Sequence, residues 1–406
     1  MIRRTSMMLL LAACGGDAEI VVADGAAFPV APFWDGIPAG GAALVTNNYS
    51  DTLSVIDLAS GDWIGDLPVG LNPVEREGPH HDAVSPDGAW VYVGISNFVP
   101  GSGSGPHGTH GNGAAEGYAL QIDTRDLSLA QDRRIDRSPG DVTFLPGIDA
   151  VAFSHFDVLR VSEALTEGKP VEATRATVAV LDAETLEMIE SVTVCATPHG
   201  LRATEDGSRL YVACYGSDEI AIVDTGTFAV QRVPVADDVA PPPNADRYQP
   251  NSVHVSPSDG LVWVTLFLAN EVRVYDPVTG AMDDACRIDV GGSPYFGMFL
   301  DNGATFAVPV QSTPGALAFI DTASCTESAR LDLEAEDCEK PHMLLLGRDG
   351  ETGPAYLVCE GDRIDPGTFV VLSSPRPDAT VERVVPVGRF PDGAVLIYPG
   401  LGISPP

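Results

Sequence analysis

Short hydrophobic runs separated by turn residues recur along almost the whole chain. After Pro198 the segment PHGLRATEDG leads into RLYVACYGSDEIAIVD, in which apolar residues alternate or form short continuous stretches. Similar units begin at Pro79 with PHHDAVSPDG, at Pro294 with PYFGMFLDNG and at Pro341 with PHMLLLGRDG. A D-G or N-G pair follows the first run in these units, as is typical of tight turns between strands. The pattern predicts an all-β chain made of repeated four-stranded units.

Three more copies complete the repeat. Pro139 opens PGDVTFLPG, Pro250 opens PNSVHVSPSDG and Pro391 opens PDGAVLIYPG, which brings the number of copies to seven. Units of about 44 to 60 residues with four strands each are typical of propeller blades. The sequence therefore predicts a seven-bladed β-propeller.

The last blade is expected to contain strands from both ends of the chain. Residues 40–70 hold a second, third and fourth strand with no first strand before them, and residues 388–399 hold a first strand with nothing after it. Joining the two would close the ring and cover both sheet edges. We therefore expect the propeller to extend over residues 38–400.

The clearest single unit, LVTNNYSDTLSVIDLASG (44–61), resembles the YVTN-repeat β-propellers of bacterial surface and periplasmic proteins. The resemblance covers about residues 38–400 and implies the propeller fold. It does not imply one activity, because propeller scaffolds carry many functions.

The first residues, MIRRTSMMLLLAACGGD, combine two arginines with a short apolar run that ends at Cys14. A run this short is typical of a secretion signal and not of a membrane span. The LAAC segment also resembles the bacterial lipobox, in which cleavage precedes a cysteine that then carries lipid. We expect a signal peptide over 1–13, lipidation of Cys14, a linker over 14–37 and a tail over 401–406. The protein would then be an exported, membrane-anchored lipoprotein, periplasmic or on the cell surface; the alternative is an ordinary signal peptide with a chance cysteine.

Six further cysteines, an even number in an exported chain, favour disulfides. Cys195 and Cys338 each lie three residues before a repeat proline, and Cys214 and Cys359 each end the following second strand. This repeated relation predicts the pairs Cys195–Cys214 and Cys338–Cys359. Cys286–Cys325 follows by elimination, on outer strands of adjacent blades.

The formal net charge of −34 makes nucleic acid and anionic lipid headgroups poor partners. Contact with the membrane would occur only through the lipid anchor. The expected partner is an unidentified protein or small molecule, and the protein is expected to be a monomer.

The histidines gather at one end of the expected channel. The first strand of each blade is innermost, so the residue after each repeat proline should lie at the channel mouth; in blade order these residues are His80, Gly140, His199, Asn251, Tyr295, His342 and Asp392. His81 is next to His80, His254 comes four residues after its proline, and His155 ends a second strand on the same side. Six of the eight histidines therefore map to one end of the channel.

One interpretation of this gathering is a ligand site at the channel mouth that binds a metal ion. Neutral imidazole is a good ligand for copper and zinc, and several blades can each direct a ring towards one centre. Adjacent residues of a strand point to opposite sides, so we expect His80 and His81 to lie where the strand has not yet begun. The expected ligands are His80, His81, His155, His199, His254 and His342, with copper as the first choice of metal and zinc as the second.

The histidine pair at the start of an inner strand, with single histidines from other blades, resembles the propeller domain of nitrous oxide reductase. In that enzyme hub histidines hold a copper cluster. This chain has no cupredoxin domain to deliver electrons, and Asn251 and Tyr295 occupy two hub positions. We therefore do not expect that reaction.

Two other interpretations stay open. The P-H-x-H and SPDG-like segments partly resemble lactonase-like propeller enzymes, whose chemistry would use the same channel mouth; the residues to test would be His81, His199, His254, Arg202 and Asp392. No acid/base pair stands out by spacing, so no catalytic residue is assigned. The third interpretation is a binding or structural surface protein without metal, in which buried histidines join neighbouring blades by hydrogen bonds.

Three insertions are expected on the same face as the histidines: residues 98–118, 156–177 and 236–249. Long loops on a rigid scaffold commonly carry binding sites. The first insertion contains His107 and His110, whose spacing we attribute to chance. It lacks the G-K-[ST] sequence of a phosphate-binding loop.

Overall fold

The computed structural model describes residues 36–71, 76–99, 112–113, 116–239 and 247–399. Cys14, the expected signal peptide, His107 and His110 lie outside these residues. Among the residues described, no helix has the length and apolar character needed to cross a bilayer.

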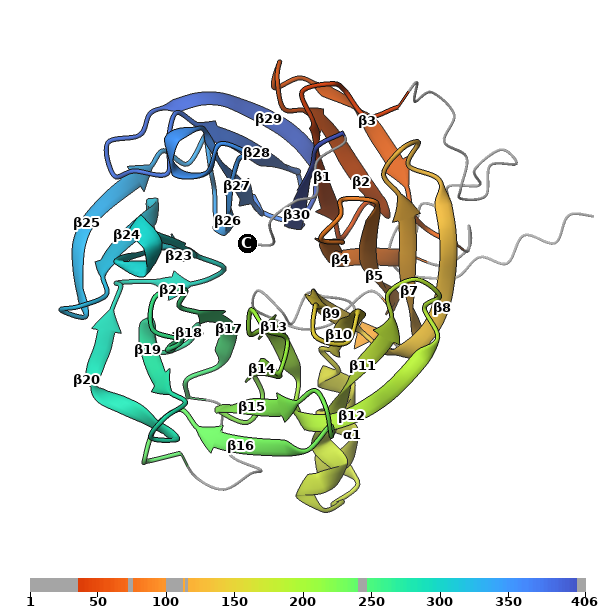
Figure 1. Ribbon diagram of the computed structural model, residues 1–406, viewed down its shortest axis with the longest axis vertical. Coiled ribbons are helices and arrows are strands. Elements are labelled where there is room, and N and C mark those ends of the chain that lie inside the picture. Colours follow the sequence, from red (N-terminus) through yellow and green to blue (C-terminus); the bar gives the residue numbers. More distant parts are fainter. Residues whose placement is uncertain (1–35, 72–75, 100–111, 114–115, 240–246, 400–406) are drawn as a thin grey trace, which may run out of the picture.

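The described residues form seven antiparallel sheets arranged as blades around a central axis (Figure 1). Blade 1 contains β4 (Arg76–Val84), β5 (Trp90–Val99), β7 (Glu116–Asp123) and β8 (Leu129–Arg137), with β6 (Asn112–Gly113) paired to β5. Blade 2 contains β9 (Pro139–Leu145), β10 (Ala150–His155), β11 (Arg175–Asp182) and β12 (Met188–Ala196). Blade 3 contains β13 (Pro198–Ala203), β14 (Arg209–Cys214), β15 (Glu219–Asp224) and β16 (Val230–Pro234). Blade 4 contains β17 (Pro250–Val255), β18 (Val262–Leu266), β19 (Glu271–Asp276) and β20 (Ala281–Asp289).

The remaining blades follow in chain order. Blade 5 contains β21 (Ser293–Pro294), β22 (Met298–Leu300), β23 (Thr305–Gln311), β24 (Gly315–Asp321) and β25 (Thr326–Leu333), with the 3-10 turn η2 (Asp301–Gly303). Blade 6 contains β26 (Pro341–Leu346), β27 (Ala355–Cys359), β28 (Pro366–Leu372) and β29 (Val381–Arg389), with η3 (Gly350–Thr352). Blade 7 contains β1 (Ala42–Asn47), β2 (Thr52–Asp57), β3 (Trp63–Pro68) and β30 (Pro391–Ile397).

Blade 7 closes the ring as the sequence predicts. The C-terminal strand β30 pairs antiparallel with β1, from Ala42 opposite Ile397 to Asn47 opposite Pro391. The prediction of an all-β, seven-bladed propeller is therefore confirmed.

The hydrophobic core lies between the blades. Seven clusters of buried apolar residues occur in the described residues, and each is shared mainly by two adjacent blades. The second strands of blades 2 and 7, β10 and β1, are buried throughout, whereas an outer strand such as β12 exposes most of its residues. Each blade therefore depends on both of its neighbours for burial.

The insertion after β10 contains a helix that the sequence analysis did not predict. It forms α1 (Val158–Thr166) and the 3-10 turn η1 (Val171–Thr174). The Asp157 side chain caps α1 by accepting a hydrogen bond from the Arg160 N–H.

Three disulfides are present in the described residues, two in the pairs that the repeat predicts and the third in the pair that followed by elimination. Their Cα–Cα separations are 5.8 Å for Cys195–Cys214 and 5.3 Å for both Cys286–Cys325 and Cys338–Cys359. All three separations lie within the normal range for disulfides. The bonds connect blade 2 to blade 3, blade 4 to blade 5, and the segment before β26 to blade 6.

Candidate functional site

Four of the histidines predicted for the channel mouth lie in the inner strands β4, β13 and β26, which Figure 1 shows around the central axis. His80 and His81 belong to β4, His199 to β13 and His342 to β26. His81, His199 and His342 are fully buried, and only 3% of the His80 surface is exposed. Three blades thus place four imidazoles in the interior at one end of the channel.

A β-bulge turns both His80 and His81 towards the channel. Pro79 pairs with Ile95 and Asp82 pairs with Val93, so β4 has one more residue than β5 over this stretch. A bulge adds a residue and bends the strand, which allows two adjacent side chains to face one side. The expectation that the strand has not begun at His80 is wrong, because β4 already starts at Arg76.

The four rings form one compact group. The ring centroids of His80 and His81 are 4.4 Å apart and stacked. His199 lies 5.4 Å from His80 and 5.8 Å from His81, and His342 lies 5.6 Å from His81. We call His80, His81, His199 and His342 the histidine cluster.

An acceptor holds the Nδ1 atom of three of these rings. The Nδ1 of His199 lies 2.8 Å from the backbone carbonyl oxygen of Asn251, which can only accept, so this Nδ1 carries the proton. The Nδ1 atoms of His81 and His342 lie 2.9 Å and 2.6 Å from the carboxylates of Asp141 and Glu360. A ring that donates from Nδ1 keeps the Nε2 lone pair for another partner.

Two of the Nε2 atoms are buried without a hydrogen bond. They belong to His81 and His342. Buried polar atoms of proteins almost always have a partner, so these two atoms require an explanation. Burial lowers the pKa of His199 to about 3 and also lowers the pKa of His342, which keeps both rings neutral.

Arginines neutralise the two carboxylates behind the histidines. Asp141 accepts hydrogen bonds from Arg202 at 2.7 Å and from the Leu201 N–H at 2.8 Å, so it connects blades 1, 2 and 3. Burial alone would raise the pKa of Asp141, but the charge of Arg202 and the hydrogen bond with His81 hold it well below its usual range. Glu360 has an equivalent environment: despite burial, Arg363 and His342 lower its pKa.

Two further buried acids border the cluster without an arginine. Asp392 accepts hydrogen bonds from Thr46 at 3.1 Å and Asn48 at 3.0 Å, and one of its oxygens lies 3.6 Å from the His80 Nε2. Among the described residues, no side chain forms a hydrogen bond with the Asp82 carboxylate, and the backbone groups of Asp82 and Val395 act on it. Burial raises the pKa of both acids well above the usual value.

Phe296 fills the space beside the rings. It lies between β21 and β22, where the inner strand of blade 5 is interrupted, and its backbone pairs with blade 6 through hydrogen bonds to His342 and Leu344. Its ring centroid is 4.7 Å from His81, 5.7 Å from His342 and 5.9 Å from His199. Apolar packing of this kind keeps water away from the histidines.

His155 and His254 do not belong to the histidine cluster, so the expectation that six rings share one centre is wrong for these two. The Nδ1 of His155 lies 2.9 Å from the Thr177 carbonyl oxygen on β11, away from the inner strand. The Nε2 of His254 lies 2.8 Å from the Ser252 hydroxyl. Each of these two rings is held by a hydrogen bond within its own blade.

The side chains as placed do not form a coordination shell. Within the described residues, no group of three or more His, Cys, Asp or Glu side chains is arranged to hold a metal ion.

The residues considered for a lactonase-like enzyme each have another partner. Arg202 is bound to Asp141, His254 contacts Ser252, and Asp392 accepts from Thr46 and Asn48. His81 is likewise paired, with Asp141, and this pairing is the arrangement that general bases use.

Sequence reasoning missed four residues of this site: Asp82, Asp141, Phe296 and Glu360. Asp141 is the second residue after its repeat proline, as His81 is in its own unit. Aligning the repeats could therefore have identified Asp141. Glu360 follows the second strand of blade 6, where blades 2, 3 and 4 have aromatic residues. Their pairing across blades could not be predicted, because it depends on the geometry of the closed ring.

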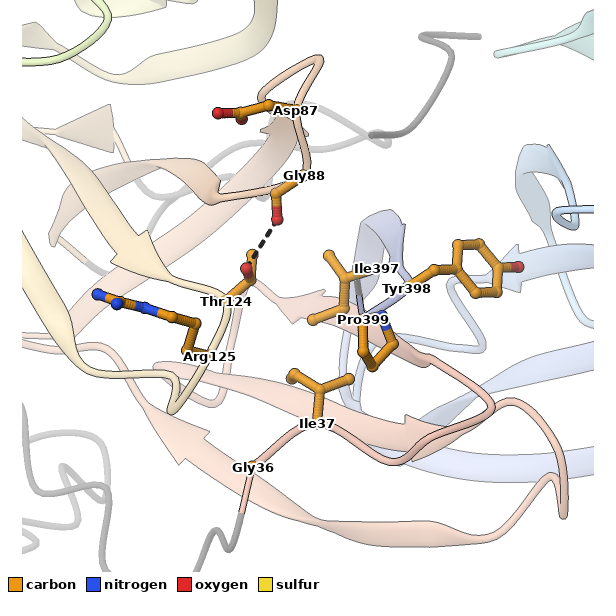
Figure 2. A pocket seen from close by; sticks show the side chains of 9 residues that line it. All are labelled: Gly36, Ile37, Asp87, Gly88, Thr124, Arg125, Ile397, Tyr398 and Pro399. Atoms are coloured by element: carbon orange, nitrogen blue, oxygen red, sulfur yellow. Dashed lines mark hydrogen bonds between the residues drawn. The ribbon is translucent and has the colours of Figure 1, made fainter. Parts of the chain in front are cut away.

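A separate cavity of about 300 Å³, drawn in Figure 2, lies between blades 1 and 7. Its walls come from the turns after β4 and β7 and from both ends of the described chain. It is lined by Gly36, Ile37, Asp87, Gly88, Thr124, Arg125, Ile397, Tyr398 and Pro399. None of the residues predicted for the site lines it.

The fold and site define the class of this chain, a seven-bladed β-propeller with buried histidines at one channel mouth. Hydrazine synthase of Kuenenia stuttgartiensis is similar over 78% of this chain and 88% of its own, with a TM-score of 0.57 and 17% identity. A protein of unknown function from Desulfotomaculum acetoxidans DSM 771 is similar over 88% of this chain and 99% of its own, with a TM-score of 0.63 and 10% identity. At these identities the likeness concerns the fold alone. No family description and no curated protein matches the chain.

Proposed function

We propose that this protein is an exported β-propeller of the YVTN-repeat kind that binds a metal ion at the top of its central channel. The ligands are His81, His199 and His342, with His80 beside them, as in the histidine-lined propeller domain of nitrous oxide reductase. Copper is the first choice and zinc the second, because imidazole suits both and copper binds more tightly in the general order of divalent metals.

One observation carries this proposal: three Nδ1 atoms are held by carboxylate or carbonyl oxygens, and the Nε2 atoms of His81 and His342 are buried without a partner. Metal-binding histidines almost always donate the other ring N–H to such an acceptor, which fixes the tautomer and the ring orientation. A metal ion would supply the partner that the two Nε2 atoms lack.

Burial of the histidine cluster also favours an ion over a larger ligand. A metal ion needs only the space at the end of each lone pair, whereas a substrate would need an open cavity beside these fully buried rings.

The export of the protein is supported by its three disulfides. Disulfides persist in oxidising compartments and are rare in the cytosol of most bacteria. We propose that Cys14 anchors the propeller to a membrane through lipid.

A lactonase-like hydrolase is the second candidate, favoured by the pairing of His81 with Asp141. The proposed metal and the proposed base use the same Nε2 atom, so the two functions exclude each other in one molecule. Hydrolysis of a lactone that survives a metal chelator and is lost in His81→Ala would support the enzyme.

Metal analysis of protein purified without an affinity tag tests the proposal. We expect about one metal ion per chain in the wild type and a loss of at least tenfold in affinity in His81→Ala/His342→Ala, because each removed ligand leaves the ion under-coordinated. The matched control is His155→Ala, which removes a buried histidine outside the cluster and should keep the metal. An unchanged metal content in the double variant would contradict the proposal.

A further inference from the structure

We infer that oxidation of the chain controls metal binding, because two of the three disulfides fix the segments from which His199 and His342 enter the histidine cluster. This inference rests on the proposed function and names how the same site is regulated. The two disulfides are Cys195–Cys214 and Cys338–Cys359.

Both disulfides stand in the same relation to a histidine of the cluster. Residues 195–199 and 338–342 read CATPH and CEKPH, so each segment begins with a disulfide cysteine and ends with a histidine of the cluster. The inner strands β13 and β26 begin at the proline of these segments. That proline pairs with the second cysteine of the disulfide, Pro198 with Cys214 and Pro341 with Cys359. Each cross-link therefore closes directly before the strand that carries the histidine.

The cross-linked segments have an irregular backbone. Thr197 and Lys340, each two residues before the histidine, have φ values of 45° and 57°, which are uncommon for residues other than glycine and persist where the surroundings fix them. A backbone hydrogen bond holds each segment: the Tyr215 N–H donates to the Thr197 carbonyl oxygen at 3.2 Å, and the Glu360 N–H donates to that of Lys340 at 3.1 Å. The Glu360 carboxylate also lies 2.6 Å from the His342 Nδ1, so this cross-link fixes both the ring and its acceptor.

Blade 1 fixes its histidines by a different means. Its inner strand β4 begins three residues before the repeat proline and pairs with β5 from Arg76 opposite Phe98 onwards. In blades 2, 4 and 7, which place no ring in the histidine cluster, the inner strand begins at the repeat proline, and no disulfide of the described residues cross-links that start. An additional link at the strand start thus accompanies the histidines of the cluster and is not a general feature of the repeat.

Oxidation makes the two cross-links. In each pair two thiols lose two protons and two electrons, one S–S bond forms, and an organic disulfide that acts as the oxidant is reduced to two thiols. In the reduced chain the same segments depend on backbone hydrogen bonds, so His199 and His342 must be ordered when the ion binds, whereas the oxidised chain is preorganised. Because disulfides persist in oxidising compartments, tight metal binding is confined to the exported protein.

Metal titration of variants without a disulfide tests the inference. Metal-free protein is titrated with Zn(II) or Cu(II) against a chromophoric chelator, below the thermal midpoint of each variant. Cys195→Ala/Cys214→Ala and Cys338→Ala/Cys359→Ala should each bind both ions about 10- to 100-fold more weakly than the wild type, the effect typical of losing a group that orients a ligand. Alanine replaces the cysteines because free thiolates would themselves bind these metals. Either variant tests the inference alone if the other does not fold.

The matched control is Cys286→Ala/Cys325→Ala. This disulfide joins β20 to the turn before β25, on outer strands and not at the starts of β13 and β26. Its cysteines are 39 residues apart in sequence, against 19 and 21 for the other two disulfides, so its removal should lower the thermal midpoint at least as far. The metal affinities should nevertheless stay within about threefold of the wild type.

A second readout identifies the residue through which a cross-link acts. In a His342→Ala background, removing Cys338–Cys359 should change the Zn(II) affinity by less than about threefold, because the ring that the cross-link positions is already absent. In a His199→Ala background, the same removal should keep its effect of about tenfold or more. Equal weakening in both backgrounds would overturn the inference, because that result indicates a general loss of structure.

The outcomes also separate the inference from the proposed function. If His81→Ala/His342→Ala abolishes binding but the variants without Cys195–Cys214 or Cys338–Cys359 keep affinities within about threefold of the wild type, the inference is wrong and the metal site stands. If the control variant binds as weakly as the other two, the inference is also wrong. If the wild type binds neither ion, both the inference and the proposed function are wrong.

Discussion

Burial keeps individual histidines of this protein neutral, and two of them lie outside the proposed metal site. Burial lowers the pKa of His155 to about 4, against a smaller opposing effect of Asp136, and that of His254 to about 3, where Arg202 adds to the lowering and Asp141 opposes it. In an unfolded chain both would have a pKa of about 6.5. At a pH between the folded and the unfolded pKa of a histidine, the unfolded state therefore binds a proton that the folded state does not bind.

This difference predicts a pH dependence of stability. As the pH falls from about 6.5 towards 4, the free energy of unfolding should decrease by roughly 1.4 kcal/mol per pH unit for each histidine, or roughly 2 kcal/mol each on going from pH 7 to pH 5. The pKa values of Asp82 and Asp392 are raised in the folded protein, so these two acids increase the free energy of unfolding as the pH falls. The contribution of each histidine is therefore measured as the difference between its variant and the wild type. Urea denaturation of metal-free His155→Gln and His254→Gln at pH 7 and pH 5 should show a smaller acid-induced loss than the wild type. A loss equal to that of the wild type would contradict the prediction.

At the scale of single residues, the sequence predicted the position of the histidines but not their partners. The repeat proline fixes the start of each inner strand, so His80, His199 and His342 could be placed at one channel mouth. Asp141 and Glu360 act across blade boundaries, and no local pattern specifies such contacts. His155 was misplaced because its side of the strand depends on a register shift within blade 2.

The same irregularity recurs at the start of the inner strands. A register shift next to the repeat proline occurs in blades 1, 2, 3, 4, 6 and 7. The residue before the proline has a positive φ in five blades; these are Ser138, Thr197, Gln249, Lys340 and Phe390, with φ between 45° and 57°. Such conformations are uncommon for residues other than glycine and cluster at functional sites. The irregular starts direct adjacent side chains of several blades into the channel mouth.

The close approach of two of these strands depends on one glycine. A Cβ atom at Gly393 would lie 3.0 Å from the Thr46 hydroxyl and 3.1 Å from both the His80 carbonyl oxygen and the His81 Cα. We expect Gly393→Ala to lower the free energy of unfolding by about 1–3 kcal/mol, because β30 and β4 must separate, and to weaken metal binding at the same time. Urea denaturation and the metal titration measure the two effects.

The control for this variant is Gly226→Ala. A Cβ atom there would meet only the Asp224 carboxylate at 3.6 Å, an ordinary contact. Its stability should stay within about 0.5 kcal/mol of the wild type. Equal stability of the two variants would show that the close approach at Gly393 is not needed.

At the scale of the whole molecule, the fold could be predicted because the repeat determines it almost alone. Seven prolines with the same flanking pattern specify seven sheets, and the incomplete units at the two ends specify the closure of blade 7. Two of the disulfides followed from the same repetition, and Cys286–Cys325 followed by elimination. Blade 5 departs from the pattern, since Phe296 interrupts its inner strand and pairs with blade 6, and a repeat cannot indicate where one copy deviates.

The LAAC segment that ends at Cys14 leads to a prediction about attachment to a membrane. If Cys14 carries lipid, the wild type should sediment with membranes and Cys14→Ser should appear in the soluble fraction with an intact propeller, because a net charge of −34 gives the protein no attraction to anionic lipid. Cys286→Ser/Cys325→Ser is the matched control: it removes cysteines that form a disulfide between blades and should remain with the membrane. Fractionation followed by mass analysis of the N-terminal peptide measures both position and lipid. A Cys14→Ser variant that still sediments with membranes would show that another part of the chain holds the protein there.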